Sequence, residues 1–307
     1  MADPLEVVAE ALLAYWSSPL TLSIVAVCGA SMATLLYVFL TNARNAKLRV
    51  SLLTGFYALT IFFWLFVAAS LFLCILQSRM VAYQRTGVQT AAAGAVIVAL
   101  AVSSVLSYVV WRRGAASVLR RFAPRELRAE ETWVQDYANL VGEFEGLPKV
   151  PVLLVESDHP LAMAVGGRTP RVLVSRGLLS LLEREEVETA VAHELMHIKH
   201  HDAEFKVFST VFSRILFFDP FSKFFDPAVH REREYLADEM SGRSTGRPAA
   251  LASALLKIAN HGTPPKAVWG LSIHGSGRGL FSRYPPLRER VRRLLLLSDL
   301  LRNTPQA

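Results

Sequence analysis

The chain has 307 residues, of which 52% are hydrophobic, and its mean hydropathy is +0.32. That is too apolar for an ordinary soluble enzyme of this length, so part of the chain is expected to lie in a membrane. The net charge of +7 is expected to attract the chain to anionic lipid head groups. The sequence contains no phosphate loop, zinc knuckle or RNA-binding motif that would indicate another use of this charge. We expect no nucleic-acid partner.

Three apolar stretches, residues 20–40, 52–76 and 88–111, contain no Asp, Glu, Lys or Arg. Each reaches the ~20 residues that a helix needs to cross a bilayer core. The two cysteines, Cys28 and Cys74, both lie within these stretches, so no disulfide framework is expected in the polar part. We therefore predict a membrane domain over residues 1–113, with about three transmembrane helices, and a second domain over residues 114–307.

The charges that flank the apolar stretches predict their orientation. Basic residues gather in the first loop and after the third stretch: Arg44, Lys47, Arg49, Arg112, Arg113, Arg120 and Arg121. The opposite side carries Arg79 and Arg85, and the N-terminal segment is acidic. The positive-inside rule then places the N-terminus outside and the second domain in the cytoplasm. No cleavable signal peptide is expected, because a basic region is missing before residue 20.

The second domain opens with a helix predicted over residues 127–144, which ends near Gly146 and Pro148. Two short strands are predicted over residues 150–155 and 171–174, with a third possible at residues 163–165. Two Gly and a Thr-Pro pair between them supply the turn.

Residues 191–197 read Val-Ala-His-Glu-Leu-Met-His and follow an acidic helix start. In a helix, His193 and His197 lie on one face, one turn apart, where two neutral imidazoles can bind one zinc ion at about 2.0–2.1 Å. Glu194 can then contact a water on the metal without binding the metal itself. A solvated helix is the alternative, but an apolar stripe around these residues favours a buried hydrolytic zinc centre.

A third zinc ligand is expected downstream. Metzincins carry a third His six residues after the second, where this chain has Ala203, so that class is excluded. Glu234 would complete a His₂Glu site with water in the open position. Asp238, one helical turn later, would accept a hydrogen bond from the other ring nitrogen of a ligand histidine. A solvated, charge-rich helix is the alternative for this segment.

The segments around these residues are less specific. His200, His201 and Asp202 are interpreted either as solvated or as hydrogen-bonding partners of the ligands. Residues 203–229 hold eight phenylalanines, and Pro220 and Pro227 are expected to interrupt helical continuity there. An interfacial amphipathic helix is favoured for them over a core helix beneath the zinc site. Residues 248–260 and 287–300 are predicted to be packing helices, and residues 261–283 a loop over the cleft.

Residues 151–297 resemble the integral-membrane zinc endopeptidases that include HtpX and the CAAX prenyl protease. The matching pieces are residues 164–168, 172–179, 192–199, 234–238 and 284–290. The resemblance implies an α+β fold in which transmembrane helices precede a mainly helical, zincin-type metallopeptidase domain with a small β-sheet. It also implies that His193, His197 and Glu234 bind one zinc ion and that Glu194 is the catalytic base.

Zincins commonly place an edge strand beside the metal, where an extended substrate can pair by main-chain hydrogen bonds. We assign that role to the four residues Ala162, Met163, Ala164 and Val165.

Two positions depart from the family pattern. Leu161 stands where the family usually has Asn, and Arg283-Tyr284-Pro285 stands where it often has Thr-His-Pro. Because that His is missing, Tyr284 becomes the candidate hydrogen-bond donor to a developing oxyanion. A tyrosine half-buried before a Pro-Pro turn is the alternative, and His230 and His274 are weaker candidates.

These residues together predict a membrane-anchored, zinc-dependent endopeptidase that acts on polypeptides, with membrane-protein quality control as one role. A CAAX-type protease is a less favoured form of this hypothesis, because such enzymes have more than three spans. One alternative is a signal-transducing protease like the antibiotic-sensing inducers of β-lactamase, although no sensor domain follows residue 300. Another is a non-catalytic scaffold, against which the retention of His193, Glu194, His197 and Glu234 speaks.

Overall fold

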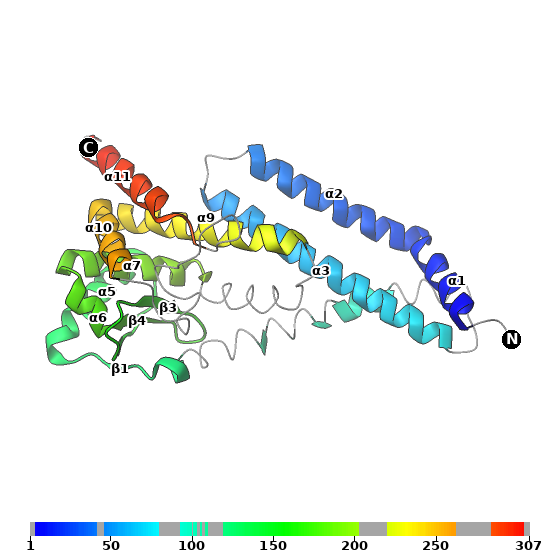
Figure 1. The fold of residues 1–307 in the computed structure, drawn as a ribbon, viewed down its shortest axis with the longest axis horizontal. Helices are drawn as coiled ribbons and strands as arrows, with labels where there is room; N and C mark the ends of the chain where they lie inside the picture. Colours follow the sequence, from blue (N-terminus) through cyan, green and yellow to red (C-terminus); the bar gives the residue numbers. More distant parts are fainter. Residues whose placement is uncertain are drawn as a thin grey trace. The chain divides into compact units, whose positions relative to one another are not determined.

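The computed structural model describes residues 4–41, 46–79, 93–99, 101–102, 105, 108–109, 119–202, 220–261 and 284–303. The chain divides into two compact units, Met1–Tyr108 and Val109–Ala307 (Figure 1). The described part is mostly helical and has one small sheet, which confirms that part of the predicted fold class.

The first unit contains the helices α1 (Pro4–Trp16), α2 (Pro19–Thr41) and α3 (Ala46–Arg79). Helices α2 and α3 cover the first two apolar stretches, and residues 93–99 of the third are helical. Within the described ranges no single helix is both long and apolar enough to cross a membrane. The segments Val8–Trp16 and Pro19–Leu35 meet that condition only as a pair, with a bend of 57° between them. The three transmembrane spans therefore stay a prediction.

The second unit contains a sheet of four strands in the order β1-β2-β4-β3. The strands are β1 (Arg125–Glu126), β2 (Val152–Val155), β3 (Ala162–Val165) and β4 (Arg171–Ser175). Strands β2 and β4 are parallel, whereas β3 runs antiparallel to β4 with Met163 opposite Leu173. The three predicted strands are confirmed. β1 was not predicted, because two residues are too few to show an alternating pattern.

The helices of this unit are α5 (Thr132–Phe144), α6 (Arg176–Leu181), α7 (Arg184–Lys199), α9 (Pro220–Thr245), α10 (Pro248–Asn260) and α11 (Leu287–Asn303). The two predicted packing helices are confirmed as α10 and α11. The helix predicted from residue 127 begins only at Thr132, because β1 and the short 3₁₀ turn Ala129–Glu131 precede it. Its end is confirmed by Gly146, which has a positive φ of 69°.

The expectation that Pro227 interrupts helical continuity is wrong. Pro220 is the first residue of α9, where a missing N–H costs nothing, and α9 continues through Pro227. One internal proline removes a single backbone hydrogen bond, and the packing of α9 against α7, α10 and α11 offsets that loss. Residues 203–219 and 262–283 lie outside the described ranges, so the interfacial segment and the loop over the cleft stay predictions.

Helix α7 forms the centre of the second unit. It contacts α5, α9 and α10 as well as β3 and β4, and residues 186–198 are buried throughout (Figure 1). On the sheet face towards α7, Val152, Val172 and Ala164 join the main core. On the opposite face, Met163 and Leu173 pack with Leu119 and Phe122. A helix enclosed in this way keeps its polar side chains away from bulk water.

The turn from β4 into α6 fixes the loop that leads into β3. The Ser175 hydroxyl caps α6 by accepting hydrogen bonds from the Leu178 N–H (3.1 Å) and the Leu161 N–H (2.8 Å). It also donates to the His159 carbonyl at 2.7 Å. Gly177 permits this close packing, because a Cβ atom at that position would overlap the Asp158 carbonyl oxygen.

We expect Gly177→Ala to lower the free energy of unfolding by about 1–3 kcal/mol, since the added methyl group forces backbone to move. Thermal unfolding of the detergent-solubilised protein measures the effect. The control is Gly142→Ala in α5, where the nearest atom to the new Cβ is 3.9 Å away and no loss is expected. Equal unfolding temperatures for the two variants would contradict the packing argument.

Candidate metal centre

The ligand-bearing helix α7 begins with a reciprocal cap. The Glu183 N–H donates to the Glu186 carboxylate at 2.9 Å, and the Glu183 side chain accepts from the backbone N–H of the first turn. Beyond this turn, the apolar residues Val191 and Leu195 are completely buried. His193 and His197 lie among them, with relative exposures of 0% and 8%. Burial of two imidazoles at this spacing calls for a polar partner.

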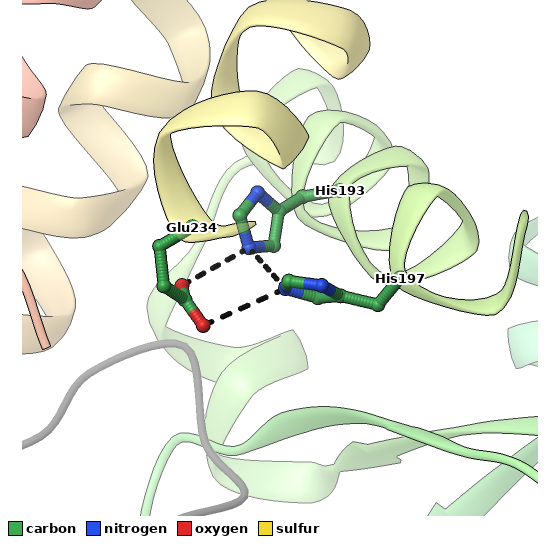
Figure 2. A group of neighbouring side chains, drawn as sticks. All are labelled: His193, His197 and Glu234. Atoms are coloured by element: carbon green, nitrogen blue, oxygen red, sulfur yellow. Dashed lines mark hydrogen bonds and ion pairs between the residues drawn. The ribbon is translucent and has the colours of Figure 1, made fainter. Parts of the chain in front are cut away.

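Helix α9 provides that partner (Figure 2). Glu234 points at both histidines, with its two carboxylate oxygens each 3.6 Å from an Nε2 atom. The two Nε2 atoms are 3.1 Å apart. Donor atoms bound tetrahedrally to one zinc ion at 2.0–2.2 Å lie about 3.3–3.5 Å from one another. One donor atom from each of the three side chains lies within 4.8 Å of the other two, which is close enough for the three to bind one metal ion.

Asp238 lies one turn beyond Glu234, on the far side of His193. Its Oδ1 atom is 3.1 Å from His193 Nδ1, an ion-pair distance without hydrogen-bond geometry. Burial lowers the pKa of His193, but the carboxylates of Asp238 and Glu234 outweigh burial and raise that pKa to about 9. The structure thus places Asp238 beside the His193 ring nitrogen that points away from the triad, and the hydrogen bond expected from that nitrogen stays a prediction.

Arg290 on α11 holds Asp238 in place. Its guanidinium donates two hydrogen bonds to the Asp238 carboxylate, at 2.7 and 2.6 Å, and lies 3.3 Å from Glu234 Oε2. Burial raises the pKa of Asp238, but Arg290 outweighs burial and holds that pKa below its ordinary value. Arg290 is only 2% exposed. The sequence reasoning missed this residue.

His197 has a corresponding carboxylate. Its Nδ1 atom is 2.9 Å from Asp202 Oδ2, and Asp202 in turn accepts a hydrogen bond from Arg233 of α9. Of the two alternatives that the sequence leaves for Asp202, the buried partner of a histidine is the one observed. His201 is exposed, with a positive φ of 55°, and His200 contacts the Met240 sulfur at 2.9 Å.

Glu194 faces the sheet rather than the triad carboxylate. Its Oε2 atom accepts a hydrogen bond of 2.6 Å from the Ala164 N–H of β3. Leu161, three residues earlier, exchanges its bonds with Ser175 of β4, since the Ser175 N–H donates to its carbonyl at 2.8 Å. Antiparallel strands alternate these directions, so Ala162 and Ala164 direct their backbone groups away from β4. This edge of β3 faces Glu194.

The buried charges around the triad fit a divalent cation. Glu194, Glu234, Asp202 and Asp238 contribute four carboxylates, and two guanidinium groups, from Arg233 and Arg290, oppose them. With neutral imidazoles the formal charge is −2, which one Zn²⁺ would cancel. The raised pKa of His193 has the same origin. Without a metal ion, the carboxylates around this imidazole favour its protonated form.

The oxyanion candidates stay predictions. Tyr284 is half-buried and its hydroxyl oxygen is inaccessible to solvent. His230 is buried on α9, four residues before Glu234. His274 lies outside the described ranges.

Comparison with known proteins identifies the family to which the chain is similar. Residues 75–275 match the family model described as BlaR1 peptidase M56. A protease HtpX homolog of Pyrococcus abyssi is 30% identical over 251 residues, which cover 66% of this chain and 86% of that protein. A protease HtpX homolog of Dictyoglomus thermophilum is 26% identical over 250 residues, covering 66% and 82%. Among solved structures, Ste24p of S. mikatae matches 91% of this chain and 99% of its own, with 15% sequence identity and a TM-score of 0.41.

We expect zinc to raise the unfolding temperature of chelator-treated protein, because a divalent cation relieves the repulsion among the buried carboxylates. At free zinc about 1,000-fold above Kd, the gain is about 4 kcal/mol. His193→Ala should abolish the shift, measured by thermal unfolding with and without zinc. Glu186→Gln, which alters a buried carboxylate paired with Lys257 at 2.9 Å, should retain it. An undiminished shift in His193→Ala would locate zinc elsewhere.

Proposed function

The chain belongs to the M56 peptidase family, and on that premise we propose that it is a zinc-dependent endopeptidase that hydrolyses peptide bonds in polypeptides. The observation that carries the proposal is the set of separations of 3.1 to 3.6 Å among the donor atoms of His193, His197 and Glu234. These distances, two of which are to different oxygens of Glu234, are close to the spacing of about 3.3–3.5 Å between ligands of one tetrahedral zinc ion. One ion is held by each chain, through the two Nε2 atoms and the Glu234 carboxylate.

Zinc, when bound, supplies Lewis-acid chemistry, acidifying water and polarising a carbonyl group. The protein's own contribution to proton transfer is Glu194. Its carboxylate accepts the proton of the attacking water as the new C–O bond forms. It then delivers that proton to the amine nitrogen as the C–N bond breaks. The Ala164 N–H, 2.6 Å from Oε2, keeps the carboxylate directed for both transfers.

The substrate lies along β3 in this proposal. β3 is an edge strand of the described sheet. The Ala164 N–H is taken by Glu194, so the outward groups offered to an extended peptide are the Ala162 N–H and the carbonyls of Ala162 and Ala164. Met163 and Val165 direct their main-chain bonds to β4 and hold the strand in register. Tyr284 is the proposed donor to the carbonyl oxygen that becomes negative during attack.

The first unit anchors the enzyme in the bilayer in this proposal. Support comes from the three apolar stretches, residues 20–40, 52–76 and 88–111, which lack charged residues. We propose a multi-pass membrane domain over residues 1–113, with the N-terminus outside and the peptidase domain, residues 114–307, in the cytoplasm. Substrates would then include membrane proteins, as expected of a quality-control protease.

A second candidate function follows from the family description. Its reference to BlaR1 favours the signal-transducing alternative, in which the same centre cuts one dedicated partner. The two functions differ in the breadth of substrates rather than in the chemistry. Cleavage of an unfolded, casein-like substrate supports the broad endopeptidase.

We expect Glu194→Gln to retain zinc and to lose cleavage of unfolded casein by at least about 100-fold, because the amide cannot accept the proton. Bound zinc and cleavage are measured on the same detergent-solubilised samples. Cleavage at the parental rate would eliminate Glu194 as the base. Zinc in both samples without cleavage in either would favour the dedicated-substrate function.

We expect Ala164→Pro to lower kcat/KM by at least about tenfold while leaving the sheet folded. The substitution removes an N–H that points at Glu194 and not at β4. Met163→Pro is the matched comparison, since the Met163 N–H belongs to the β3–β4 ladder and its loss should lower the unfolding temperature. Full activity in Ala164→Pro would remove β3 from the site.

A further inference from the structure

Each histidine of the triad is backed by its own carboxylate, and each carboxylate is held by its own buried arginine. His193 Nδ1 lies 3.1 Å from Asp238, which Arg290 binds with two hydrogen bonds. His197 Nδ1 lies 2.9 Å from Asp202, which accepts a hydrogen bond from Arg233. Both arrangements use α9, which carries Asp238 and Arg233. Arg290 of α11 completes the first, and Asp202, three residues beyond the end of α7, completes the second.

We propose that Asp202 and Arg233 form a positioning pair for His197, equivalent to the pair formed by Asp238 and Arg290 for His193. This rests on the proposed zinc site. Asp202 accepts the Nδ1–H of His197, which leaves Nε2 unprotonated and directed at the metal position. Arg233 fixes the carboxylate of Asp202, and through it the plane of the ring.

The burial of Asp202 and Arg233 allows the pair to hold the His197 ring in place. Asp202 and Arg233 are each 7% exposed, so neither charge is well solvated. A buried carboxylate without a counter-charge would take up a proton or turn towards water, and in both cases it would cease to hold the imidazole. The planar guanidinium restricts such motion more than a lysine ammonium would, because its donors have fixed directions.

The position of Arg233 in the chain strengthens the case. It directly precedes Glu234 in α9. One residue is therefore the proposed third zinc ligand, and its neighbour binds Asp202, the carboxylate that contacts His197. A displacement of α9 would therefore move both together. The competing explanation is a purely structural ion pair that fastens α9 to the end of α7, and it predicts a loss of stability without a change in the metal site.

The test measures the metal site directly. Full-length protein in detergent is stripped of metal, then titrated with zinc in competition with a chromophoric chelator. The visible absorption spectrum of the cobalt-loaded protein reports ligand geometry. The variants are Asp202→Asn, Arg233→Met and Arg233→Lys. The matched control is Glu186→Gln, a buried α7 carboxylate ion-paired with Lys257. Thermal unfolding of each metal-free protein records the structural effect separately.

We expect Asp202→Asn to weaken zinc binding by about 10- to 100-fold and to alter the cobalt spectrum. Arg233→Met should act in the same direction, and Arg233→Lys should recover part of the affinity. Glu186→Gln should bind zinc as the parent does, whatever its unfolding temperature. If Asp202→Asn does not fold, the two Arg233 variants decide the question.

Parental zinc affinity and an unchanged cobalt spectrum in Asp202→Asn would overturn the proposal while leaving the zinc site in place. Tighter zinc binding by Arg233→Met would show that the guanidinium acts only as a repelling charge, and would overturn its positioning role. A parent protein that binds no zinc would instead refute the proposed function, and this inference with it.

Discussion

Four carboxylates are buried where α7 meets α9, and their mutual repulsion is the constraint that the rest of the second unit has to satisfy. Two of them, Glu234 and Asp238, come from a single turn of α9. Such a group is tolerated in a dry interior only if cations are fixed beside it. Arg233 and Arg290 supply part of that charge, and the remainder matches a divalent metal ion. The hydrophobic packing of α7 against the sheet excludes water from these carboxylates. The helices that cover α7 on its other side have to carry the arginines that neutralise them.

Local patterns made much of this predictable. The His-Glu-x-x-His spacing places the two imidazoles on one face of α7 irrespective of the rest of the fold, and Glu234 and Asp238 follow the same helical rule on α9. What the sequence could not show depends on contacts between distant segments. Arg290 reads as one more basic residue of α11, although its spacing from Leu294 and Leu297 puts it on the buried face. Asp202 remained ambiguous because its φ-positive neighbour His201 turns it inwards only in the folded chain.

The family model and the relatives that match this chain carry different names, BlaR1 peptidase M56 and protease HtpX homolog. In this chain, the candidate metal centre is formed by α7 and α9 with Arg290 of α11, whereas the proposed substrate strand is β3. Under the proposed function, a peptide has to reach the edge of β3 in an extended form before it is cut. Breadth or narrowness of action is therefore a property of access to the edge of β3. The basicity of Glu194 does not determine how many substrates are cut.

Arg290 has a consequence for the order in which the protein becomes active. It is encoded ninety-six residues after Glu194, in α11, yet it neutralises Asp238 and approaches Glu234. During synthesis α7 and α9 emerge first, and at that stage their carboxylates lack one of their two counter-charges. We therefore expect the centre to form only after α11 has docked, when the chain no longer exposes extended segments to cleavage.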